Sequence, residues 1–181
     1  MIKILLLLLF ITSAYAGVKE DMFTLYQNKN FKKACTMGFK HFSRYKKDEA
    51  FVSLYGFSCL HADYIDRLAI PMTTLKHTAE ARANAAYFSV IVMQKKLLYH
   101  ALVDGYNLSN FKLPTTDYIL SKVFDQYSHL PKNEKRSFYI FKDPKDKKLS
   151  YKLYLVKERG VSKMVIEEFY DTMLIKRHIY W

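Results

Sequence analysis

Glycine and proline are scarce in this sequence, with 5 glycines and 4 prolines among 181 residues. Collagen-like and low-complexity chains are rich in these residues, so the composition excludes both classes. So few glycines also argue against a glycine-rich phosphate-binding loop. Hydrophobic residues make up 50% of the chain and aromatic residues 16%, which is typical of a folded globular protein. The length fits one domain of ordinary size or two small ones.

Familiar catalytic and metal-binding motifs are also missing from the sequence. The six histidines never occur at H-x-x-x-H or H-E-x-x-H spacing, and no serine lies in a G-x-S-x-G motif. We therefore predict no catalytic residue, no bound metal and no cofactor. Glu80 is an isolated carboxylate that could act as a general acid on an envelope polysaccharide. However, an acidic residue near a helix start also stabilises the helix dipole without any catalytic role.

The first residues have the order of a secretory signal peptide. One early lysine precedes the unbroken apolar run Ile4–Ile11, and small residues follow at Ala14 and Ala16. This order predicts a signal peptide over residues 1–16 with cleavage after Ala16. An uncleaved anchor or a buried core helix is the alternative, although the run is shorter than the roughly 20 apolar residues that span a membrane. We expect an exported protein, periplasmic or secreted, that is soluble or peripherally attached to the envelope and not membrane-spanning after signal removal.

The sequence contains only two cysteines, Cys35 and Cys59. Their spacing fits neither a C-x-x-C redox motif nor a zinc ligand set. In the oxidising compartment that export implies, an even number of cysteines predicts a disulfide between them. Such a bond would stabilise the fold by roughly 3 kcal/mol. The alternative is a pair of unpaired, buried thiols that pack as small apolar side chains.

Apolar residues recur at helical spacing over residues 20–130. A short polar turn at residues 28–30 separates the first two predicted helices. A long helix is expected over Thr78–Leu98, with a break before residues 99–103 and a stop at Gly105. The sequence thus predicts a series of antiparallel helices connected by short turns.

The helical pattern also repeats along the chain with a period of 34 residues. The repeated pairs are Phe31 and Ala34, Ile65 and Leu68, and Tyr99 and Leu102. With the turn region Leu25–Ala34, this pattern resembles the tetratricopeptide repeat family, whose unit is a 34-residue helix–turn–helix. The resemblance covers about residues 17–105. It implies stacked helix pairs with a groove for a peptide or a partner helix, and it places the two cysteines on neighbouring helices of consecutive units.

After Pro131 the apolar pattern changes to a period of two, which is typical of strands. Four strands are expected, at about 137–141, 149–156, 161–170 and 173–180. Short turns connect them, so they should form an antiparallel meander. The predicted fold class is α+β, with helix-pair repeats over residues 17–132 followed by a small, basic β-meander over residues 133–181.

The formal net charge of +12 favours anionic partners. Five lysines lie around the first predicted hairpin: Lys142, Lys145, Lys147, Lys148 and Lys152. With neighbouring tyrosines they form a possible binding site for an anionic envelope polymer or lipid. Alternatively, these lysines only keep a small sheet soluble and protect its edges from pairing. Export makes intracellular nucleic acid an unexpected partner.

Our leading hypothesis is a non-enzymatic scaffold or adaptor whose helical groove binds another envelope protein or a peptide segment. The second hypothesis is anion binding through the basic β region, and the third is an envelope polysaccharide hydrolase. Aromatic side chains of the helical part belong either to the core or to the groove as anchors. These residues are Tyr26, Phe31, Tyr55, Tyr87 and Tyr99.

Overall fold

The computed structural model describes residues 17–109, 111–130 and 136–181. Helices come first and one antiparallel sheet follows, which confirms the predicted α+β fold class. The helices are α1 (Val18–Gln27), α2 (Phe31–Tyr45), α3 (Glu49–His61), the short 3₁₀ helix η1 (Ile65–Leu68), α4 (Ala69–Thr74), α5 (Ala79–Asp104) and α6 (Ile119–Ser128). The strands are β1 (Phe138–Lys142), β2 (Leu149–Glu158), β3 (Val161–Tyr170) and β4 (Met173–Tyr180).

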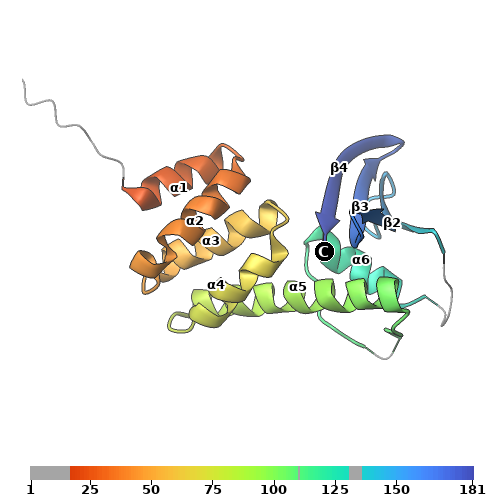
Figure 1. Ribbon diagram of the computed structural model, residues 1–181, viewed down its shortest axis with the longest axis horizontal. Helices are drawn as coiled ribbons and strands as arrows, with labels where there is room; N and C mark the ends of the chain where they lie inside the picture. Colours follow the sequence, from red (N-terminus) through yellow and green to blue (C-terminus); the bar gives the residue numbers. More distant parts are fainter. Residues whose placement is uncertain (1–16, 110, 131–135) are drawn as a thin grey trace, which may run out of the picture.

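The longest helix, α5, connects the helical part to the sheet. In Figure 1, α4 lies beside the N-terminal half of α5, while α6 and the sheet lie over its C-terminal half. The side chain of Thr78 caps α5 by accepting the N–H of Ala81 at 3.1 Å. Gly105 ends it in the left-handed region at φ 76°, as the sequence predicts.

The expected break before residues 99–103 is wrong, because α5 continues without interruption to Asp104. Leu98 and Ala101 are both buried, so the same face of the helix remains in the core across the expected break. No proline or glycine lies in this stretch to interrupt the backbone hydrogen bonds.

Helices α2 and α3 approach each other closely and are joined by the disulfide Cys35–Cys59. A methyl group added at Gly38 of α2 would lie 2.5 Å from a ring carbon of Tyr55 on α3. At the next residue of α3, a methyl group at Gly56 would lie 2.5 Å from the ring of Phe88 on α5. Glycine at these two positions therefore sets the spacing of α2, α3 and α5.

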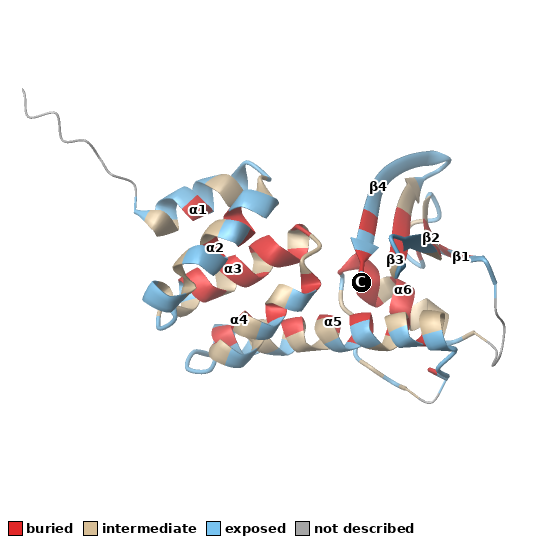
Figure 2. Cartoon of the chain, in the orientation of Figure 1, coloured by how far each residue is buried: buried red, intermediate tan, exposed pale blue. Residues whose placement is uncertain are grey.

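The four strands form a meander in the order β1-β2-β3-β4, as the sequence predicts. Pairing aligns Tyr139 with Leu153 and Leu153 with Ile166 on the inner face of the sheet. These three side chains are buried in the common core. Tyr139 also contacts Tyr127 of α6, with ring centroids 5.1 Å apart. The inner face of the sheet is therefore covered by helices, and Figure 2 shows red, buried segments on α6 and on the strands next to it.

Residues 1–16, which carry the predicted signal peptide, lie outside the described residues, and so does Pro131. In the described part of the chain, each helix is too short or too polar to cross a bilayer.

Candidate functional site

A groove of about 440 Å³ lies on the surface of the helical part. Its apolar lining includes Phe23 from α1, and Leu54 and Phe57 from α3, with Ala50 at the same surface. Phe23 is 50% exposed, so half of its side chain faces solvent at the groove. Concave apolar surfaces of this size are typical of binding sites for ligands or peptide segments.

The position of Phe23 follows from the way α1 packs. Met22 is the residue of α1 that is fully buried. Successive residues of an α-helix are rotated by about 100°, so Phe23 points away from the contact that Met22 makes. The neighbouring helix α5 contributes Glu80 and Asn84 to the opposite side of the groove.

Charged and polar side chains surround this apolar lining. Lys19 donates a hydrogen bond to Asp48 at 2.8 Å, so its charge is balanced within the protein. Asn84 of α5 donates to the hydroxyl of Ser53 on α3 at 3.1 Å. Glu20 and Glu80 are exposed on the two sides. The groove is therefore an acidic site on a chain whose net charge is +12.

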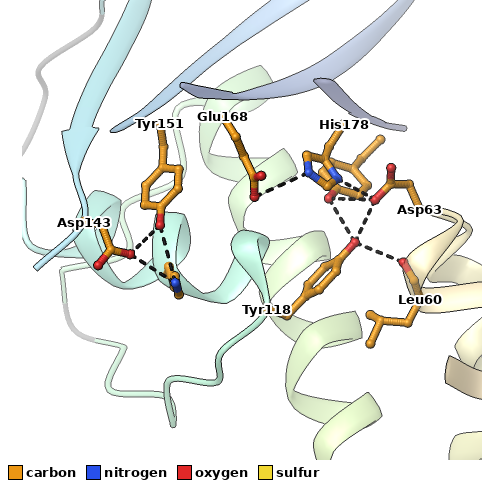
Figure 3. Close-up of polar contacts among 9 residues, drawn as sticks. Leu60, Asp63, Tyr118, Asp143, Tyr151, Glu168 and His178 are labelled. Atoms are coloured by element: carbon orange, nitrogen blue, oxygen red, sulfur yellow. Dashed lines mark hydrogen bonds and ion pairs between the residues drawn. The ribbon is translucent and has the colours of Figure 1, made fainter. Parts of the chain in front are cut away.

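A second cluster of polar side chains joins the helical part to the sheet (Figure 3). The carboxylate of Asp63 lies 2.7 Å from Nδ1 of His178 and accepts a hydrogen bond from the hydroxyl of Tyr118 at 2.8 Å. The hydroxyl of Tyr180 also donates to Asp63, at 3.3 Å. Nε2 of His178 lies 3.7 Å from Glu168, close enough for an ion pair but too far for a hydrogen bond.

This environment changes the protonation of His178. Burial alone lowers the pKa of an imidazole, but the hydrogen bond to Asp63 and the carboxylate of Glu168 together raise the pKa of His178 above 6.5. The positive charge of Lys176, on the same strand, lowers the pKa of His178. Burial raises the pKa values of Tyr118 and Tyr180 well above 10, so both hydroxyls stay protonated and can donate.

The cluster is suited to hold the structure together and poorly suited to catalysis. His178 is only 2% exposed, so its imidazole has no surface on which to meet a substrate. Its partners come from the loop after α3, the start of α6, and strands β3 and β4. We therefore assign it a structural role as the polar junction, defined by Asp63, Tyr118, Glu168, His178 and Tyr180.

A further buried carboxylate orders the turn between β1 and β2. Asp143 is 4% exposed and accepts hydrogen bonds from Tyr151 and from Lys122 of α6, the latter at 3.0 Å (Figure 3). It also accepts the backbone N–H groups of Lys145 at 2.8 Å and Asp146 at 3.1 Å. Burial opposes the charged form, but these hydrogen bonds outweigh it and hold the pKa of Asp143 far below its usual range.

The structure separates the five predicted anion-binding lysines into two groups. Lys145, Lys147 and Lys148 are exposed in the turn that Asp143 orders, and Lys142 is exposed at the end of β1. Lys152 is instead half-buried on β2, with its ammonium 5.0 Å from the ring centroid of Phe138. Four of the five are thus presented to solvent at one end of the sheet.

The aromatic anchors suggested by the sequence are not the ones that line the groove. Tyr55 is fully buried, and Tyr26, Phe31, Tyr87 and Tyr99 are half-buried at other places. The aromatic residues of the groove are Phe23 and Phe57, which the sequence analysis did not single out. The helical spacing of Phe23 and Phe57 fits a core position equally well, so no signal in the sequence distinguishes groove residues from core residues.

Within residues 17–109, 111–130 and 136–181, no three histidine, cysteine or acidic side chains are grouped so that they could hold a metal. Glu80, the candidate general acid, lies exposed at the groove in the first turn of α5. Comparison with protein-family models, with curated proteins and with solved structures found no match to this chain.

Proposed function

We propose that this protein is an exported, non-enzymatic scaffold that binds a peptide segment or helix of another envelope protein in the groove on α1, α3 and α5. The observation that supports this function is the apolar groove itself, with the half-exposed ring of Phe23 at its surface. In the predicted repeat register, α1 and α3 are the first helices of two successive units, and the N-terminal part of α5 is the first helix of the third. A surface shared by successive units is where helical repeat proteins bind extended partners.

The groove also indicates the chemistry of its partner. Apolar side chains on one face of the partner would cover Phe23, Leu54 and Phe57. A lysine or arginine beside them would meet the carboxylates of Glu20 and Glu80. The preferred ligand is therefore an amphipathic segment with apolar anchors and a basic flank.

Export is consistent with the disulfide between Cys35 and Cys59, because such bonds persist in oxidising compartments. The predicted signal peptide at residues 1–16 supports the same location.

Phe23→Ala tests the proposal. A labelled amphipathic peptide of about 18 residues, with leucines at helical spacing and lysines at both ends, serves as the ligand. Loss of a central aromatic anchor is expected to weaken binding about 30-fold, as measured by fluorescence anisotropy. Ala50→Trp should weaken binding as well, because Ala50 is exposed at the groove and a larger side chain there occupies it.

Phe39→Ala provides the matched control, because Phe39 is 53% exposed, like Phe23, but lies on α2 away from the groove. This variant should change the Kd by less than threefold. Equal loss of affinity in both phenylalanine variants, or no loss in either, would show that the peptide does not bind in the groove. Replacing the terminal lysines of the peptide by glutamates should weaken binding if Glu20 and Glu80 contact the ligand.

A further inference from the structure

Two turns meet at one end of the sheet. The β1–β2 turn carries Lys145, Lys147 and Lys148, and the β3–β4 turn lies beside it, because Leu149 pairs with Tyr170. The N–H of Asp171 donates to the carbonyl oxygen of Lys148 at 2.7 Å, which joins the two turns. The ammonium of Lys148 also lies 5.6 Å from the ring centroid of Tyr170.

The β3–β4 turn exposes an unusual concentration of apolar side chains. Met173 is 71% exposed, Ile175 50% and Leu174 46%, and Tyr170 on the other strand is 43% exposed. We call these four residues the apolar tip. In Figure 2 the start of β4 is pale blue and curves away from the helices. Soluble surfaces rarely gather large apolar side chains in this way unless they contact a partner.

Cations surround the apolar tip. Lys142, Lys145, Lys147 and Lys148 lie at the same end of the sheet, and exposed Lys176 follows the tip on β4. Among the nearby carboxylates, that of Asp143 is already balanced by Lys122, and Asp146 accepts the backbone N–H of Lys148 at 2.9 Å. With Asp171 included, this end of the sheet carries more positive than negative charge.

We propose that this end of the sheet docks on an anionic lipid bilayer, with the apolar tip in the interfacial region and the lysines at the headgroups. The two features together favour a bilayer. A soluble polyanion would use the lysines but gain nothing from Met173, Leu174 and Ile175. A bilayer surface offers anionic headgroups and an apolar region only a few ångströms below them.

Docking in this way leaves the groove accessible. In Figure 1 the β3–β4 turn and helix α1 lie at opposite sides of the molecule. The proposed membrane contact is therefore independent of the proposed peptide site, and both could be occupied at once.

Binding of the full chain to vesicles tests this proposal. Vesicles of phosphatidylcholine with about 30% phosphatidylglycerol are compared with vesicles of phosphatidylcholine alone. Each lysine near an anionic surface contributes about a fivefold change in partitioning, so the triple variant Lys145→Gln, Lys147→Gln, Lys148→Gln should bind roughly 100-fold more weakly. The matched control replaces three exposed lysines of α2 with glutamine: Lys32, Lys33 and Lys40.

Contact of the tip itself is read by tryptophan fluorescence. Trp181 is the single tryptophan of the chain, and its ring lies 4.9 Å from the ammonium of Lys163. Lys163 pairs with Val156 at the end of β2 and β3 opposite to the apolar tip, so Trp181 is far from the tip. The double variant Trp181→Phe, Met173→Trp therefore moves the only indole to the apolar tip. The apolar residues 1–16 could also bind vesicles, but they are the same in all variants. The emission of the tryptophan at position 173 therefore reports only on contact between the apolar tip and the bilayer.

With anionic vesicles, we expect a blue shift and quenching by brominated lipids at position 173, and little change for Trp181 in the unaltered chain. The lysine triple variant should lose this signal at lipid concentrations where the control triple variant keeps it. Unchanged emission at position 173 while the chain is vesicle-bound would overturn the proposal, as would equal loss in both triple variants. Binding to a soluble polyanion such as polyphosphate, with no emission change on vesicles, would identify a polymer site instead.

Discussion

Asp63→Asn is expected to lower the free energy of unfolding by about 3 kcal/mol at pH 6. The change removes the carboxylate that pairs with His178 at 2.7 Å, while His178 is 2% exposed and remains buried. The backbone at Asp63 has φ 63°, a conformation that asparagine tolerates well, so backbone strain contributes little. Chemical denaturation of the two proteins, followed by circular dichroism, measures the difference.

The same pair predicts how stability depends on pH. Because the pKa of His178 is raised in the folded state, its contribution is complete below about pH 6.5 and is lost as the pH rises through the folded-state pKa. As the pH rises from about 6.5 through the folded-state pKa of His178, the free energy of unfolding of the unaltered chain should therefore fall more than that of Asp63→Asn. Glu168 also raises the pKa of His178 and Lys176 lowers it, and both residues are unchanged in the variant.

The exposed pair His100–Asp104 is a matched control, because its Nδ1 and Oδ2 atoms are 2.8 Å apart, close to the 2.7 Å between His178 and Asp63. Both side chains are at least half exposed, so Asp104→Asn should cost less than about 0.5 kcal/mol. A similar small loss for Asp63→Asn would mean that the polar junction does not hold the sheet to the helices.

Removal of the disulfide is expected to cost about 3 kcal/mol of stability. Cys35 and Cys59 are separated by 24 residues, and reduction frees this loop in the unfolded chain. Both cysteines are fully buried, so alanine is the better replacement, because serine would bury a hydroxyl group. For the double variant Cys35→Ala, Cys59→Ala, the melting temperature should fall by about 6–12 °C.

Reduction of the unaltered chain should produce most of the same decrease in melting temperature, and a reducing agent should have no effect on the double variant. Alkylation of the unreduced protein should modify neither cysteine. Labelling of both thiols, or equal melting temperatures with and without reductant, would contradict the disulfide account.

Features that depend on neighbouring residues were predictable from the sequence. Alternating residues and short turns located the strands of the meander, and residues 161–170 and 173–180 agree with β3 and β4. The parity of the cysteines, with the expected export, predicted the disulfide. The tetratricopeptide resemblance stays a prediction.

Features that depend on the fold were not predictable. Asp63 and His178 are 115 residues apart, and the sequence places Asp63 only in a polar turn between helices. Phe23 has the helical spacing of a core residue, and its exposure depends on how α1 packs beside α3 and α5. The apolar tip was missed for a similar reason, because an alternating pattern does not show which end of a sheet the helices leave open. The break expected in α5 before residues 99–103 does not occur, because Leu98 and Ala101 continue the same buried face of the helix.

Binding of an apolar, basic peptide segment in the groove on α1, α3 and α5 should change the environment of the residues that line it. Backbone amide spectra of isotope-labelled protein, recorded during titration with the lysine-flanked peptide at high salt, test it most directly. We expect the shifts to be concentrated in residues 19–23, 50–57 and 80–84, which contain the groove lining. Shifts confined to the strands, or the disappearance of all shifts at high salt, would contradict it, because contacts in an apolar groove are poorly screened by salt.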